Sequence, residues 1–195
     1  MILSNREMQK ALDQGRLIIE PEPSPREPSI ENPHCPYNTH SVDLKLHHEI
    51  SVPTEGPFTI DLTQPGSITD MLSKHSKKYT LSKKQPYRLK KGEFILARTL
   101  EKIELSTSHE QPYLAARIEG KSSRARCGLL VHFTAPTVHP GFSGSLTLEM
   151  INLGPAAISL VPEMYIAQLI VEEVKGELIH NPSQFQDQTT PEGKQ

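Results

Sequence analysis

A short basic segment and one later glutamate are the residues of this chain best suited to chemistry. The segment from Gly120 to Arg126 reads Gly-Lys-Ser-Ser-Arg-Ala-Arg. Its hydroxyls and cations suit a polyphosphate, because guanidinium and ammonium groups pair with phosphate oxygens. Glu149 follows further along the chain, and a glutamate buried beside a ligand gains a raised pKa that suits it to move protons. The set indicates a site that binds a phosphorylated ligand and activates water.

Each part of this set also has a structural interpretation. The basic segment could be a surface turn between two strands, with Gly120 allowing the backbone to turn tightly. Glu149 lies in the stretch 145–152, where apolar side chains alternate with it and occupy the opposite strand face. A lone glutamate on a strand most often faces solvent. The pattern alone leaves both interpretations open.

A metal-dependent site is the next alternative. His47-His48-Glu49 matches half of the zinc-deaminase signature, but Cys35 and Cys127 have no cysteine nearby to supply the other half. Adjacent histidines on a strand are also expected to point to opposite faces. The sequence therefore argues against a zinc site and predicts that both cysteines are thiols.

Composition and charge narrow the class of protein. The chain has 195 residues and reads as one domain over 1–195. A net charge of −2 argues against a broad nucleic-acid surface. The sequence contains no apolar run of about 18 residues, so no membrane span is predicted. The first residues lack the features of a signal peptide. We expect a cytoplasmic protein without nucleic-acid or membrane partners.

The hydrophobic pattern predicts a strand-rich domain. Ser4 and Glu7 form a capping box for a short helix that Gly15 would end. Alternation predicts strands at 17–19, 41–46, 58–62, 94–99, 114–118, 145–152 and 166–171, and residues 67–75 read as one or two helical turns. A proline-rich surface loop is expected over 21–36 and a mobile tail over 176–195. Many short strands favour an antiparallel barrel or sandwich.

Segments in order along nearly the whole chain resemble the dCTP deaminase and trimeric dUTPase superfamily, and its deaminase branch in particular. They are Met1–Ser4 with the following helix, His40–Leu46, Gly120–Leu129, Val131–Glu149, Ile166–Ile170 and, in weakened form, Ser183–Gln188. Their order and spacing are more specific than any single motif. The resemblance implies a mainly β, dUTPase-like barrel or jelly roll of short antiparallel strands with a short N-terminal helix.

The resemblance also implies an activity: hydrolytic deamination of dCTP to dUTP and ammonia without zinc, in the synthesis of dUMP and dTTP. It makes Glu149 the general acid/base, Ser122 a partner of the attacking water and Arg126 a supporting group. The substrate-binding residues it implies are Lys121, Ser123 and Arg124 near the phosphates, Thr134 and Ala135 at the pyrimidine edge, His139 at the sugar, Gln168 near the triphosphate, and Phe185 and Gln188 in a closing tail. It further implies Mg²⁺ bound with the triphosphate, dTTP as an inhibitor, and a homotrimer with sites between subunits.

The chain departs from the family pattern at several positions. His139 stands where aspartate is usual. In dUTPases that aspartate activates the water that attacks the phosphate chain, so His139 argues against dUTP hydrolysis. A neutral imidazole could still hydrogen-bond the 3′-hydroxyl of the sugar. In the tail, Gln184, Phe185 and Asp187 replace lysine, tyrosine and glycine, which predicts weaker triphosphate binding. Two alternatives stay open: a bifunctional dCTP deaminase/dUTP diphosphatase, and a nucleotide-binding homologue with another substrate or no activity.

Overall fold

The computed structural model describes residues 1–31, 33–61, 63, 67–108, 112–179, 181 and 185–193. The helices are α1 (Asn5–Asp13), α2 (Ser67–Lys74) and α3 (Ser122–Ala125). The strands are β1 (Leu17–Glu20), β2 (Val42–Lys45), β3 (Glu49–Pro53), β4 (Ser76–Thr80), β5 (Tyr87–Leu89), β6 (Phe94–Leu105), β7 (Tyr113–Gly120), β8 (Leu129–Val131), β9 (Thr137–Val138), β10 (Ser143–Asn152), β11 (Ile158–Leu160) and β12 (Tyr165–Val174). No described helix has the length and apolar character needed to cross a bilayer.

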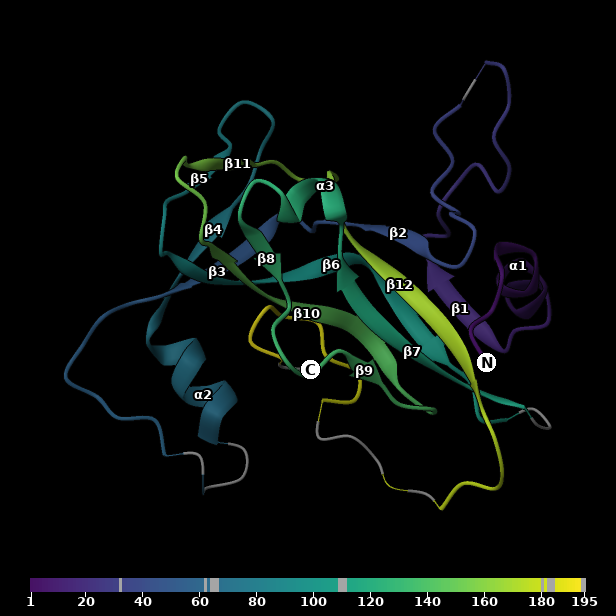
Figure 1. Cartoon of the computed structure of the whole chain (residues 1–195). Helices are drawn as coiled ribbons and strands as arrows, with labels where there is room; N and C mark the ends of the chain where they lie inside the picture. Colours follow the sequence, from purple (N-terminus) through teal and green to yellow (C-terminus); the bar gives the residue numbers. More distant parts are fainter. Residues whose placement is uncertain are drawn as a thin grey trace.

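Two antiparallel sheets form the body of the fold (Figure 1). One has the order β4-β3-β6-β10-β8, and β1 also pairs with β6. The other has the order β2-β12-β7-β9, and β11 and β5 form a separate pair. The long strands β6 and β10 run antiparallel, and a register shift between Ser145 and Thr147 interrupts their ladder. The predicted mainly β architecture of antiparallel strands with a short N-terminal helix is confirmed.

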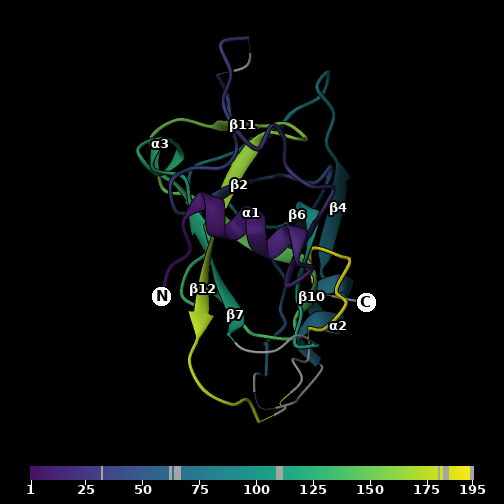
Figure 2. The same ribbon diagram turned by 90° about the vertical axis from the view of Figure 1, so that its right-hand side faces the viewer.

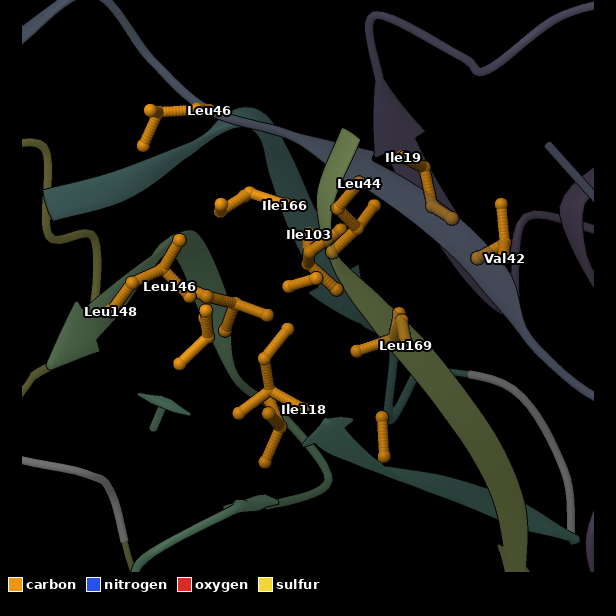
Figure 3. Close-up of a cluster of buried hydrophobic side chains, with 14 of the residues drawn as sticks. Ile19, Val42, Leu44, Leu46, Ile103, Ile118, Leu146, Leu148, Ile166 and Leu169 are labelled. Atoms are coloured by element: carbon orange, nitrogen blue, oxygen red, sulfur yellow. The ribbon is translucent and has the colours of Figure 1, made fainter. Parts of the chain in front are cut away.

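The core lies between these sheets (Figure 3). Side chains from β1, β2, β6, β7, β10 and β12 point toward one another there: Ile19, Val42, Leu44, Ile103, Ile118, Leu146, Leu148, Ile166 and Leu169. Each comes from a strand whose apolar residues face inward, so alternation along the sequence determines which face is buried. Burying such side chains is the main source of stability, at about 25 cal/mol for each Å² of apolar surface.

The N-terminal helix lies across the outside of the strands (Figure 2). The Ser4 side chain accepts a hydrogen bond from the backbone N–H of Glu7, as the capping box predicts. Met8 and Ala11 are buried. Gly15 has a φ of 69°, so the chain leaves the helix through the left-handed conformation expected of glycine there.

The strand predictions hold in the core and fail at its edges. The expected strands at 17–19, 41–46, 94–99, 114–118, 145–152 and 166–171 correspond to β1, β2, β6, β7, β10 and β12, and the expected helical turns at 67–75 correspond to α2. The strand expected at 58–62 is wrong for the described residues 58–61, where the Phe58 ring stacks on His75 at a centroid distance of 4.1 Å instead of joining a sheet. Residue 62 lies outside the described part. The short strands β3, β4, β5, β8, β9 and β11 were not predicted.

Candidate functional site

A cavity of about 460 Å³ lies beside the middle of β10. Its walls come from β10, the segment between β8 and β10, helix α2 and residues 185–193 near the C-terminus. Five of the predicted site residues line it: Ala135, His139, Glu149, Phe185 and Gln188. The structure thus brings the predicted general acid/base, a pyrimidine-edge residue, the sugar residue and two tail residues into one space.

Glu149 lies on the half-exposed face of β10, as alternation predicts, and this face opens into the cavity. Its backbone carbonyl accepts a hydrogen bond of 2.7 Å from the N–H of His132, the residue that follows β8. The His132 side chain then turns to Glu149, with Nδ1 lying 2.5 Å from Oε2. The His132 side chain is 9% exposed and the Glu149 side chain is 34% exposed. Both residues line the cavity, so the imidazole is largely buried in the wall while the carboxylate is more open to the cavity.

The surroundings of His132 favour its charged form. Burial lowers its pKa, but the contact with Glu149, the backbone of Ala135 and the negative charges of Glu149 and Glu119 outweigh burial, so the pKa lies above 6.5. His132 has a φ of 80°, a conformation that few residues other than glycine adopt. Such strain at a cavity wall is often found at functional sites. The contact between His132 Nδ1 and Glu149 Oε2 fixes the direction of the carboxylate.

Residues 185–193 lie against β10 and close one side of the cavity (Figure 1). Gln188 donates from Nε2 to the carbonyl of Ser145 at 2.7 Å, and its own carbonyl accepts from the N–H of Ser145 at 3.1 Å. The N–H of Asp187 donates to the carbonyl of Ser143 at 2.7 Å. Gly144 faces this segment with a φ of 147°, and a Cβ there would lie 3.0 Å from the Gln188 nitrogen. The described end of the predicted tail is therefore held in a specific position.

A second carboxylate, Glu192, lines the same cavity. Its side chain is 0% exposed, and neither carboxylate oxygen accepts a hydrogen bond from the described part of the chain. Lys78 on β4 lies 3.9 Å away and is itself 60% exposed. Sequence reasoning did not single out Glu192 or His132. A carboxylate that is buried without donors is costly, so this one is a candidate for contact with a ligand.

The basic segment lies elsewhere in this chain. Residues 121–126 line no part of the cavity, and Figure 1 shows α3 at the opposite end of β8 from the C-terminal segment. Ser122, Ser123 and Arg126 are exposed, and Arg124 is partly exposed. Gly120 ends β7 without a positive φ, and the backbone continues directly into α3, so the segment is a short helical turn between β7 and β8.

Lys121 of the basic segment and Gln168 of β12 both lie beside Asp43. Lys121 forms an ion pair with Asp43, and its Nζ lies 6.0 Å from the Tyr165 ring centroid. Gln168 on β12 pairs in register with Asp43 and accepts a hydrogen bond of 3.5 Å from Ser41. Thr134 is exposed and lies outside the cavity wall. The structure therefore separates the predicted phosphate residues from Glu149 within one chain.

The His47-His48-Glu49 group lies outside the cavity. The expectation that the two histidines point to opposite faces is wrong, because they lie between β2 and β3 and their ring centroids are 3.8 Å apart. Arg98 already meets the group, with Nη2 at 2.7 Å from His47 and 3.2 Å from Glu49. Burial and the Arg98 charge lower the pKa of His47 to about 4. Both cysteines are thiols, as predicted.

Comparison with known proteins decides the family. A model of the dCTP deaminase-like family matches residues 2–174. The chain belongs to that family. This dCTP deaminase-like chain is 35% identical over 172 residues to the "dCTP deaminase, dUMP-forming" of Dictyoglomus thermophilum, covering 87% of this chain and 78% of the relative. It is 37% identical over 175 residues to the "dCTP deaminase" of Thermomicrobium roseum, covering 89% and 80%.

A solved structure has the same fold as this dCTP deaminase-like chain. The crystal structure of 2′-deoxycytidine 5′-triphosphate deaminase from Agrobacterium tumefaciens superimposes with a TM-score of 0.60 and 16% sequence identity. The match covers 91% of this chain and 49% of that protein, so the chain spans about half the length of that structure.

Proposed function

We propose that this protein hydrolyses dCTP to dUTP and ammonia in the synthesis of pyrimidine deoxynucleotides. The observation that carries the proposal is the Glu149 carboxylate, which is held against His132 on the wall of a cavity large enough for a nucleoside. Membership of the dCTP deaminase-like family and relatives named dCTP deaminase supply the substrate.

The geometry supports a proton-transfer role for Glu149. The ionised carboxylate takes a proton from water, and the resulting hydroxide attacks C4 of cytosine. The attack moves the electrons of the C4=N3 double bond onto N3. Glu149 gives its proton to the amino group, which leaves as ammonia while the C4=O bond forms, and the proton of the added hydroxyl passes through Glu149 to N3, which completes uracil. His132 contacts the carboxylate at Oε2 and so holds it in the direction of the cavity between these steps. The chemistry needs no zinc in this scheme.

The separation of Glu149 from the basic segment supports a site shared between subunits. No Lys or Arg of the described residues lines the cavity, whereas a triphosphate needs cations. In a homotrimer, Ser122 and Arg126 of a neighbouring copy would meet the cavity, together with Lys121, Ser123 and Arg124. Thr134, His139 and Gln168 complete the proposed substrate contacts.

Magnesium enters the proposal as a companion of the nucleotide. Asp43, the carboxylate beside the proposed phosphate residues, is already paired with Lys121. The hydroxyls and cations of residues 121–126 suit phosphate oxygens better than they suit a metal ion. This donor set fits Mg²⁺ that is held mainly by phosphate oxygens and water. We place the enzyme in the cytoplasm and expect dTTP, which shares the triphosphate and deoxyribose, to compete for the site.

A product assay tests the proposal. Purified protein with dCTP and Mg²⁺ should release ammonia, and Glu149→Gln should abolish the release while nucleotide binding remains. Glu20→Gln is the matched control, because Glu20 is also a strand glutamate but is exposed and lies outside the cavity. Full turnover by Glu149→Gln would refute the assignment of Glu149. Nucleotide binding without any turnover by the unaltered protein would favour a binding homologue.

The name of one relative favours a second candidate function. The Dictyoglomus protein is called dUMP-forming, which corresponds to deamination combined with release of pyrophosphate. His139 counts against this reaction, because it lines the cavity where aspartate is usual, and in dUTPases that aspartate activates the water that attacks the phosphate chain. Pyrophosphate that appears in step with ammonia would establish this bifunctional reaction. Ammonia with dUTP alone would establish the monofunctional enzyme.

A further inference from the structure

The second carboxylate of the cavity, Glu192, lacks hydrogen-bond donors, so it is suited to bind a ligand that supplies them. Its side chain is fully buried on the cavity wall, and its oxygens accept no hydrogen bond from the described residues. Lys78, at 3.9 Å, lies beyond hydrogen-bond distance and is largely solvated. A buried carboxylate without hydrogen-bond donors is unfavourable, so a ligand that supplies donors should stabilise this conformation.

The segment that carries Glu192 is positioned by its own contacts. Gln188 is fixed to Ser145 by hydrogen bonds of 2.7 and 3.1 Å, and Gly193 turns the chain with a φ of 83°. The fold of the segment therefore holds the carboxylate at the cavity, and the exposed Lys78 is its ion-pair partner at 3.9 Å. The same wall arrangement presents Glu149 to the cavity from β10.

The chemistry of the cavity selects which part of a nucleotide meets Glu192. Phosphates carry negative charge and no donors at neutral pH, so a carboxylate repels them. A deoxycytidine nucleotide has donors at the 4-amino group and at the 3′-hydroxyl. His139 on the same wall is available for the sugar. Glu149 acts on the water and on the leaving amino group in the proposed reaction, and its Oε2 is paired with His132. Glu192 is the second carboxylate of the described lining, and it can receive the other N–H of the amino group.

We propose that Glu192 accepts a hydrogen bond from the 4-amino group of cytosine and so distinguishes cytosine from uracil nucleotides. Uracil has a carbonyl oxygen at this position, and two acceptors facing each other repel. Glu192 is thus a specificity-determining residue that the tail delivers to the site. The inference rests on the proposed function, because it takes a cytosine nucleotide as the ligand.

Equilibrium binding of dCTP and dUTP with Mg²⁺ tests the inference. All proteins carry Glu149→Gln, so that no ligand is consumed. Adding Glu192→Gln should weaken dCTP binding about tenfold or more, since a bond to a charged acceptor is lost. It should leave dUTP binding unchanged or tighter, because the glutamine amide can donate to the uracil oxygen. The ratio of the two dissociation constants is the decisive quantity.

Two control variants separate recognition from structure. Glu177→Gln removes an exposed carboxylate near the same end of the chain and should leave the ratio unchanged. Lys78→Gln removes the cation near Glu192 and should also leave the ratio unchanged. If Lys78→Gln reproduces the Glu192→Gln effect, the carboxylate has a structural role and the inference is wrong.

The remaining outcomes are also decisive. Equal weakening of dCTP and dUTP would place Glu192 at the sugar, and equal tightening would place it at the phosphates; either result overturns the amino-group assignment. A starting protein that does not prefer dCTP leaves no discrimination for Glu192 to provide and overturns it too. If the preference depends on Glu192 but the protein with Glu149 intact releases no ammonia, the proposed function fails and the recognition role stands.

Discussion

Gly144→Ala should displace the C-terminal segment from the cavity. A Cβ at this position would lie 3.0 Å from the Gln188 nitrogen and 3.2 Å from its carbonyl oxygen. Gly144 also has a φ of 147°, which L side chains rarely adopt, and strain of this kind costs about 1–3 kcal/mol. The backbone of Gln188 has to move, and the hydrogen bonds between Gln188 and Ser145 are lost with it.

The magnitude follows from these contacts. Three hydrogen bonds join Ser145 and Gln188, with lengths of 2.7, 3.1 and 3.2 Å. At about 1 kcal/mol each, their loss shifts the docking equilibrium by roughly 3 kcal/mol, or about a hundredfold toward the open segment. Because Phe185, Gln188 and Glu192 leave the cavity wall together, nucleotide affinity should fall as well.

Hydrogen exchange measures this displacement. The Asp187 amide donates to Ser143 and the Ser145 amide donates to Gln188, so both should exchange faster in Gly144→Ala. The control is Gly92→Ala, where φ is 77° but no atom lies within 4 Å of the added Cβ. It imposes the backbone strain without the collision. Unchanged exchange at both amides in Gly144→Ala, or equal acceleration in the two variants, would refute the reasoning.

Three more substitutions have expected outcomes. Asp187 has a φ of 57°, so Asp187→Gly should stabilise the docked segment by about 1 kcal/mol and slow exchange at its amide. His132→Gln should lower the free energy of unfolding by about 1 kcal/mol. Because the pKa of His132 is raised above 6.5 in the folded protein, this loss should be complete below pH 6.5 and should disappear as pH rises through the folded pKa. Denaturant titrations at several pH values measure it. Burial raises the pKa of Glu101 from 4.5 to about 7. The free energy of unfolding should therefore fall by roughly 3 kcal/mol as pH rises between these values. Glu101→Gln should remove that fall, and a variant whose stability depends on pH as before would contradict the assignment.

Local periodicity explains what the sequence predicts well. The strands that line the core alternate apolar and polar residues, and this pattern places Glu149 on the face of β10 that opens into the cavity. The capping box at Ser4 is equally local, since its partners are three residues apart. Residues whose roles depend on such near neighbours can be assigned from the sequence alone, because the chain itself keeps those neighbours together.

Pairing between distant segments explains what the sequence did not predict. His132 reaches Glu149 because β8 pairs with β10 through Val131 and Met150, and strand β8 is too short to show alternation. Glu192 reaches the cavity only because Gln188 docks on Ser145. No periodic pattern encodes either contact. The strand predicted at Phe58 is wrong for the converse reason: the segment alternates apolar and polar residues, but it pairs with no strand among the described residues.

The charges around the cavity favour one orientation of a bound nucleotide. Among the described residues the lining contains two carboxylates, Glu149 and Glu192, and no Lys or Arg. A triphosphate placed there would face both carboxylates at short range in a partly desolvated space, where like charges repel strongly. The base, which carries donors and no charge, suits the same space. The phosphates would then project out of the cavity, and in the proposed assembly residues 121–126 of another copy would supply cations to them. The position of α3 outside the cavity is therefore consistent with the proposal that assembly completes the site, because one chain contains Glu149 and the basic segment apart.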